Sequence, residues 1–115
     1  MKAGERHGMP EGALDLVAGR FGALAQPLRL RLLRALEGGE RTVTDLIEAT
    51  GAGQANVSRH LRVLMDAHMV SRRREGLNAY YRISDPAIFK LCDLVCRQIR
   101  AYFEANAAKF RRGRF

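Results

Sequence analysis

Residues 54–62 read QANVSRHLR, a run in which short polar and basic side chains recur between apolar ones. The spacing of three or four positions among Val57, Leu61, Leu64 and Met65 predicts a helix whose apolar residues face the core. Glutamine and asparagine can pair bidentately with adenine, arginine with guanine, and serine with bases or phosphates. The candidate base- and phosphate-contacting residues are Gln54, Asn56, Ser58, Arg59, His60 and Arg62. For His60, a packed or solvated helix histidine is the alternative.

The segment after this helix predicts a two-stranded hairpin rich in arginine. Apolar and polar residues alternate along residues 79–83, after a turn at residues 75–78. We expect one of Tyr80 and Tyr81 to pack beneath the hairpin, and we assign neither to DNA. A solvated run of charge is the alternative to DNA contact for the basic residues. The candidate contacts to the DNA backbone or minor groove are Arg73, Arg74 and Asn78.

Composition favours a polyanionic partner. The chain has 115 residues, a formal net charge of +8 and a pI near 10.5, and 17 of its 20 basic residues are arginine. No apolar run approaches the roughly 20 residues that span a bilayer, and no signal peptide precedes the first predicted helix. Two cysteines outside any disulfide framework fit a reducing compartment. We therefore expect a cytoplasmic protein with no membrane contact.

Catalysis is not expected. The sequence has no Gly-rich phosphate loop, no motif of paired carboxylates and no Ser-His-Asp or Cys-His signature. A chain of this length forms one domain and is too small for a cleft between domains. An adaptor for protein partners would be expected to lose the polar residues of the 54–62 segment, which are present. The sequence thus predicts a DNA-binding protein and not an enzyme.

Helices are predicted to precede the DNA-contacting elements. The first runs from about Leu14 to Leu24, and Pro27 can open the second because its missing N–H costs nothing in a first turn. Thr44 is expected to cap a third helix over Asp45–Thr50, which a tight Gly51–Gly53 turn joins to the helix that begins at Gln54 as a helix-turn-helix. The second helix is expected to bury Leu30, Leu33 and Leu36.

A last helix and two terminal segments complete the predicted organisation of the chain. A last long helix is expected to start near Asp85-Pro86 and to run to about Ala108. The chain then divides into a flexible segment 1–12, a DNA-binding and dimerisation domain 13–108 and a basic tail 109–115.

Three motifs follow one another in an informative order: residues 26–33 (QPLRLRLL), residues 57–64 (VSRHLRVL), and residues 73–76 with 80–83. They resemble the second helix, the recognition helix and the wing of the ArsR/SmtB family of bacterial transcriptional repressors. The resemblance implies a mainly α fold with a β-hairpin wing, a winged helix-turn-helix. It also implies a homodimer that pairs through its first and last helices, binds an inverted-repeat operator in double-stranded DNA, and is released by a metal ion, a metalloid or a thiol oxidant.

The chain departs from the family's pattern at three places. His68 stands where the family usually has glycine, at a position that suits a left-handed residue. The family's metal site on the last helix needs a histidine, and the last predicted helix has none. The family's metalloid site on the third helix needs a Cys-x-Cys pair, and residues 42–46 contain no thiol. Neither familiar sensing site therefore transfers to this chain.

Cys92 and Cys96 are the remaining candidates for sensing. Their i, i+4 spacing puts both sulfurs on one helix face, about one turn apart. Two thiolates there could bind a soft metal or metalloid ion such as As(III), so Cys92 and Cys96 are the candidate metal ligands. Oxidation of the thiols is a second hypothesis. Structural packing is a third, because cysteine often serves as a small buried hydrophobe.

Apolar stripes on the first and last predicted helices indicate how two copies would pair. A stripe of this length on so small a protein is expected to be buried against a second copy. The candidate interface residues are Leu14, Val17, Phe21, Ile88, Leu91, Val95, Ile99 and Phe103. The predicted function is sequence-specific repression, relieved by a soft metal, metalloid or thiol-reactive signal. The alternative is a constitutive winged-helix DNA-binding protein without an inducer, in which both cysteines are structural.

Overall fold

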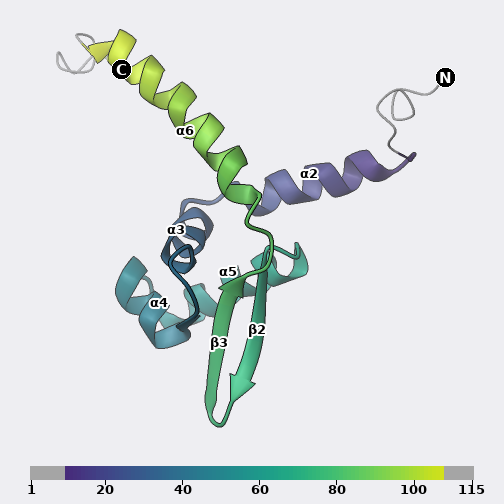
Figure 1. Ribbon diagram of the computed structural model, residues 1–115, viewed down its shortest axis with the longest axis vertical. Coiled ribbons are helices and arrows are strands. Elements are labelled where there is room, and N and C mark those ends of the chain that lie inside the picture. Colours follow the sequence, from purple (N-terminus) through teal and green to yellow (C-terminus); the bar gives the residue numbers. More distant parts are fainter. Residues whose placement is uncertain (1–9, 108–115) are drawn as a thin grey trace. The chain divides into compact units, whose positions relative to one another are not determined.

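Helices dominate the chain, and a β-hairpin follows the fourth of the described helices (Figure 1). The computed structural model describes residues 10–107, which divide after Ser84 into two units. The first nine residues of the predicted flexible segment and the whole basic tail lie outside the described residues. The first unit contains α2 (Ala13–Ala23), α3 (Pro27–Leu36), β1 (Arg41–Thr42), α4 (Val43–Thr50), α5 (Gln54–Asp66), β2 (Val70–Glu75) and β3 (Asn78–Ile83). The second unit contains α6 (Ile88–Ala105).

The core of the first unit is formed by α3, α4, α5 and the base of the hairpin. Leu46, Val57, Leu61 and Leu64 have no exposed surface, and Tyr81 keeps only 6% of its own. Tyr81 is therefore the tyrosine that packs beneath the hairpin, as one of the two was predicted to do. Burial of these side chains is what fixes α5 against the rest of the unit, because apolar area removed from water is the main stabilising term in folding.

The prediction for α3 was partly wrong. Leu33 and Leu36 are buried as expected, but Leu30 is 39% exposed and Leu32 is fully buried in its place. Residues 28–33 alternate leucine and arginine up to the final leucine pair, so the sequence offers leucines on more than one side of the helix. Packing against α4 and α5 selects the side that contains Leu32.

A capping box starts α4 earlier than the sequence suggested. The N-cap is Thr42 and not Thr44: the Asp45 backbone N–H donates to Thr42 Oγ1 (3.2 Å), and the Thr42 N–H donates to Asp45 Oδ2 (3.0 Å). This reciprocal pair satisfies two backbone donors at the helix start and favours Thr42 over Thr44. The helix ends at Gly51, whose φ of 74° closes the predicted glycine turn before α5.

The hairpin has the predicted two-residue turn and gains a strand that the sequence did not reveal. β2 and β3 pair antiparallel, with Arg72 opposite Tyr81 and Glu75 opposite Asn78. β1 pairs with the other edge of β3, giving the order β1-β3-β2. A strand of two residues is too short to show any periodicity, so only its pairing defines it. The hairpin projects away from α3, α4 and α5 (Figure 1).

In the turn between α5 and β2, His68 has a φ of 60°, so this residue itself adopts the left-handed conformation. The His68 N–H donates to Met65 O (2.9 Å), and Ser84 Oγ donates to His68 O (2.9 Å). These bonds hold a left-handed conformation that glycine would adopt at lower cost.

Together α4, the glycine turn, α5 and the hairpin form the predicted winged helix-turn-helix. No helix in the described part of the chain has the length and apolar character needed to cross a membrane.

Candidate nucleic-acid interface

One face of α5 is polar and exposed along its whole length. The opposite face carries Val57, Leu61 and Leu64, each with no exposed surface, so the rotation of the helix about its axis is fixed. The structure places five of the six predicted contact residues together on the exposed side. They are Gln54, Asn56, Ser58, Arg59 and Arg62.

His60, the sixth, is turned inward. Its side chain is 9% exposed, and its Nδ1 accepts a hydrogen bond from Arg29 Nε at 3.0 Å. Burial, followed by the positive charges of Arg29 and Arg59, lowers the pKa of His60, so the ring is held neutral with Nδ1 as an acceptor. The geometry favours the packed alternative for His60 over a DNA contact. The sequence signal for this was its position three residues after Val57 on the apolar face.

Arg29 joins three helices at this point. Besides its bond to His60 on α5, its guanidinium donates to Gly22 O (3.2 Å) and Ala23 O (3.4 Å) at the end of α2. Those carbonyls are among the groups that a helix end leaves without intrahelical partners, and they attract positive charge. Arg29 therefore ties α2, α3 and α5 together, and the sequence analysis assigned it no such role.

Two side-chain pairs lie on the exposed face of α5. Arg59 Nη2 donates to Asn56 Oδ1 at 2.9 Å, which holds these two candidate base-contacting groups side by side. Arg62 Nε lies 3.3 Å from Asp66 Oδ1 in an exposed i, i+4 ion pair. Exposed pairs of this kind are weak, about 0.3–0.5 kcal/mol, so Arg62 can exchange its carboxylate for a phosphate at little cost.

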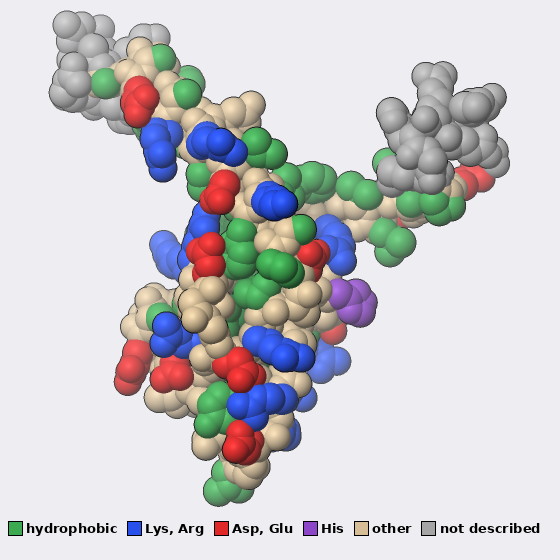
Figure 2. All heavy atoms as spheres, viewed as in Figure 1, with side chains coloured by type: hydrophobic (Ala, Val, Ile, Leu, Met, Phe, Trp, Pro, Cys, Tyr) green, Lys and Arg blue, Asp and Glu red, His purple; other side chains and the backbone are tan. Residues whose placement is uncertain are grey.

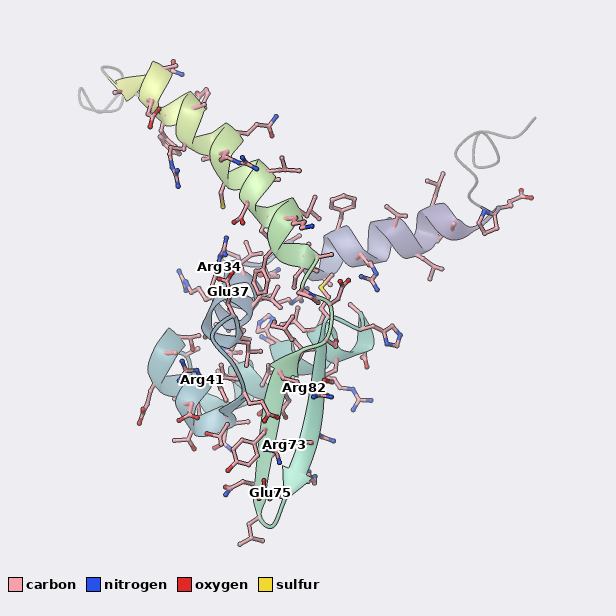
Figure 3. All side chains as sticks on the ribbon, in the orientation of Figure 1. Arg34, Glu37, Arg41, Arg73, Glu75 and Arg82 are labelled. Atoms are coloured by element: carbon pink, nitrogen blue, oxygen red, sulfur yellow. The ribbon has the colours of Figure 1, made fainter. Side chains whose placement is uncertain are left out.

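The arginines on the two faces of the hairpin differ in their hydrogen-bond and ion-pair partners. On one face, Arg73 forms two bonds to Glu40, Nε to Oε2 at 2.8 Å and Nη2 to Oε1 at 3.1 Å, and a third to Glu75 at 2.6 Å. Its guanidinium also lies 4.7 Å from the centre of the Tyr80 ring. Figure 3 shows Arg73 and Glu75 on this face together with Arg82, and Figure 2 shows basic and acidic side chains interleaved there.

These contacts make Arg73 a clamp within the protein. The hydrogen bonds from Arg73 hold the pKa of the Glu40 carboxyl below its ordinary value, and the two carboxylates raise the pKa of Arg73. Two negative charges already surround this guanidinium, so the arrangement favours a structural role over the phosphate contact predicted for it. It links β2 to the segment that leads into β1.

The opposite face of the hairpin presents Arg72 and Arg74. Their cross-strand partners are Tyr81 and Ala79, which places both on the face whose base packs against the helices. Both are exposed, and neither forms a side-chain hydrogen bond or ion pair with any residue that the structure describes. Arg74 was predicted as a contact, whereas Arg72 was missed. The available signal was the strand alternation itself, because residues two apart share a face.

The second unit presents both thiols and an apolar stripe. Cys92 is half-buried and Cys96 is exposed, and both are free of disulfides. Val95, Ile99 and Phe103 are 48–50% exposed on the same helix. Ile88 differs from these predicted interface residues because only 5% of it is exposed. Within the described residues, no cluster of three or more His, Cys, Asp or Glu side chains could hold a metal ion.

Helix α2 of the first unit is similarly uncovered. The predicted interface residues Leu14, Val17 and Phe21 are 63%, 36% and 55% exposed, and Leu16 is 76% exposed. Ala23 is the one described residue of this helix that is buried.

Comparison with known proteins agrees with this architecture. Residues 26–72, from the start of α3 into β2, match the profile of the arsR family of bacterial regulatory proteins. The chain is 35% identical to the homodimeric winged helix-turn-helix DNA-binding domain of Mb0332 from Mycobacterium bovis, with a TM-score of 0.69 over 87% of this chain and 94% of that one. It is 33% identical to Rv0081 of Mycobacterium tuberculosis, with a TM-score of 0.69 over 86% of this chain and 99% of that one.

A winged helix-turn-helix is thus the class that fold and comparison define together. The chain belongs to the arsR family of bacterial regulatory proteins, as its motifs predicted, and not to an enzyme family. Among curated proteins it is 43% identical over 77 residues to the probable mercury resistance operon repressor of Streptomyces lividans, which covers 67% of this chain. The match spans 62% of that relative's length.

Proposed function

We propose that this protein is a homodimeric DNA-binding repressor that inserts α5 of each copy into a major groove of its operator. The observation that carries the proposal is the exposed polar face of α5, whose orientation the buried Val57, Leu61 and Leu64 fix. Its amide, hydroxyl and guanidinium groups are those that distinguish base pairs in the major groove. The formal charge of +8 supplies the sequence-independent attraction to phosphates.

Dimerisation is proposed from the uncovered apolar residues of α2 and α6. Contiguous exposed apolar surface of this kind is uncommon in monomers and marks an interaction site. A second copy is the natural occupant because the Mb0332 domain, similar over nearly its whole length, is homodimeric. Two recognition helices related by a two-fold axis would meet an inverted repeat with half-sites about 34–36 Å apart.

Arg72 and Arg74 would contact phosphates from the wing. Each is exposed and uncommitted within the described chain, unlike Arg73. Arginine suits this task because its planar guanidinium donates to phosphate oxygens bidentately. Asn78, exposed at the start of β3, stays the predicted contact at the hairpin tip.

Release by a soft ion or a thiol-reactive signal at Cys92 and Cys96 is the finer part of the proposal. Cys96 is exposed and Cys92 half-buried, so reagents can reach at least one of the thiols, which a purely core role would prevent. Two thiolates suit a soft ion, and the S. lividans relative is described as a mercury resistance operon repressor. An ion that binds the DNA-free conformation more tightly would lower operator affinity by that difference, with a typical coupling of about 1–3 kcal/mol.

The test begins with the full chain and random duplex DNA. Rounds of selection should enrich an inverted repeat, and sedimentation in its presence should give two copies per duplex. Fluorescence anisotropy on that repeat, with As(III), Hg(II), Cd(II), Cu(I), peroxide or polysulfide added, should show release by at least one of them, and Mg(II) should have no effect. Failure to enrich any sequence would refute sequence-specific binding.

The variant in which both cysteines are serine provides the matched control. It should bind the repeat as the wild type does and should no longer be released, because serine keeps the size of the side chain but loses the soft ligand. Release that survives the double substitution would place sensing elsewhere. A wild-type protein that no reagent releases would support the second candidate, a constitutive DNA-binding protein, which the absence of a third ligand in the described residues favours.

A further inference from the structure

The tip of the wing carries an apolar side chain that no other described residue covers. Leu77 is 101% exposed, more than any other large hydrophobic residue that the structure describes. It occupies the second of the two turn positions between β2 and β3. Figure 2 shows a hydrophobic side chain at this end of the hairpin. Single exposed leucines are ordinary on protein surfaces. Leu77 differs from them because it lies at the tip of the proposed DNA-binding wing.

Turn geometry does not require a leucine there. Gly76 has a φ of 61° at the first central position, where two-residue hairpin loops use glycine. The second position accepts asparagine, serine or aspartate, which hydrate better than leucine and are common in turns. Leu77 therefore contributes neither packing nor turn chemistry to this chain.

The residues next to the tip give the hairpin its basic character. Arg73 bonds to Glu75 beside the turn and to Glu40 outside the hairpin, which links β2 to the segment before β1. Glu75 and Asn78 flank the turn, and Arg74, one position further from the tip, has no ion pair among the described residues. A basic hairpin with an exposed apolar tip has the chemistry of a minor-groove probe: cations for the phosphate walls and an apolar group between them.

We infer that Leu77 contacts the floor and sugar walls of the minor groove beside each half-site, and that it makes the protein prefer A·T pairs there. The inference deepens the proposed DNA-binding function and rests on it. In the minor groove, G·C pairs differ from A·T pairs by the guanine N2 amino group. That group stands on the groove floor, and an apolar side chain against it would leave its N–H without a hydrogen-bond acceptor.

The experiment isolates this amino group. The repeat selected by the wild-type protein is prepared with A·T, G·C or inosine·C pairs at the flanking positions. Inosine·C presents the major-groove pattern of G·C but lacks the minor-groove amino group. The wild type should bind the A·T and inosine·C flanks alike and the G·C flanks about fivefold or more weakly, the usual scale for one unfavourable base pair. The Leu77→Ser and Leu77→Asn variants should bind all three alike.

The Arg74→Ala variant is the control on the same hairpin. It should weaken binding to all three duplexes equally and reduce the salt dependence, whereas the Leu77 variants should keep the wild-type salt dependence. Retained discrimination by both Leu77 variants, or equal weakening of the wild type by inosine·C and G·C flanks, would overturn the inference and leave the proposed function intact. If selection enriches no DNA, the proposed function fails and this inference fails with it.

Discussion

Helices α5 and α6 both carry an apolar stripe, but the described residues bury only the stripe on α5. On α5, Val57, Leu61 and Leu64 are fully buried, whereas on α6 Val95 and Ile99 are each 50% exposed. Burial on α5 turns its polar residues outward, so one copy of the protein contains the whole of the proposed DNA-reading surface. No described residue covers the α6 stripe in this way, and in the proposed dimer a second copy would cover it. One chain is thus enough for the proposed reading surface, whereas the proposed interface needs two.

The largest expected effect comes from placing a charge on the α6 stripe. Val95→Glu should shift the protein from dimer to monomer, because a carboxylate in an apolar interface loses its hydration without gaining a partner. Operator affinity should fall by roughly 10²–10⁴-fold as the two half-sites lose their linkage. Sedimentation equilibrium and anisotropy measure the two quantities.

Arg97→Glu is the matched control, since it puts a carboxylate two residues along the same helix and therefore on its opposite side. It should leave the dimer intact. A Val95→Glu monomer that binds the full repeat as tightly as the wild type would contradict the proposed interface.

A second prediction separates base reading on α5 from phosphate contact on the wing. Arg59→Ala should cost roughly 1–3 kcal/mol on the selected repeat and little on scrambled DNA, because Arg59 lies beside Asn56 on the reading face. Arg74→Ala should weaken both duplexes by a similar factor and lower the salt dependence. Titrations of each variant on both duplexes across a salt series test this. Equal behaviour of the two variants would remove the distinction.

The buried side of α5 gives a prediction about pH. Because burial and neighbouring arginines lower the pKa of folded His60, the unfolded chain binds more protons than the folded one near its ordinary pKa of about 6.5. The contribution of His60 to stability should be fully present above that pKa and lost as the pH falls through the lowered pKa of the folded state. Protonation would also turn Nδ1 from an acceptor into a donor facing Arg29.

Denaturant unfolding of the wild type and of His60→Gln over the range from pH 7.5 to pH 5 measures this. The wild type should lose more stability than the variant as the pH falls. The same pH dependence in both proteins would show that His60 is not its source.

The smallest effect is expected at the Arg73 clamp. Glu40→Gln removes one of the two carboxylates that hold this exposed guanidinium, so stability should fall slightly. Binding to DNA of any sequence should become somewhat tighter, because the variant has one negative charge fewer and a freer Arg73 on the wing. Anisotropy with scrambled duplex at low salt measures the gain. Weaker binding would instead indicate that the clamp positions the wing for DNA.

Elements with local signals were predicted well. The helical spacing of the 54–66 segment and the glycine turn at Gly76 identified α5 and the hairpin, because both depend on residues close together in the sequence. The two-residue β1 was not predicted, since only its pairing with β3 defines it.

The roles of side chains whose partners are far away in the sequence could not be predicted from local patterns. Arg72, Arg73 and Arg74 are identical in type and consecutive, yet Glu40, 33 residues from Arg73, engages that one alone. His60 was predicted on the DNA-contacting face, but its side chain is buried and its Nδ1 accepts a hydrogen bond from Arg29, 31 residues away.

The sequence alone was enough to predict the helices, the hairpin, the family and the types of side chain available for DNA, because these depend on periodicity, turn residues and motifs along the chain. Folding then selects which of those side chains stay exposed and without an ion pair inside the protein. That choice follows from burial and from ion pairs between residues far apart in the sequence, and these form only when the chain has folded.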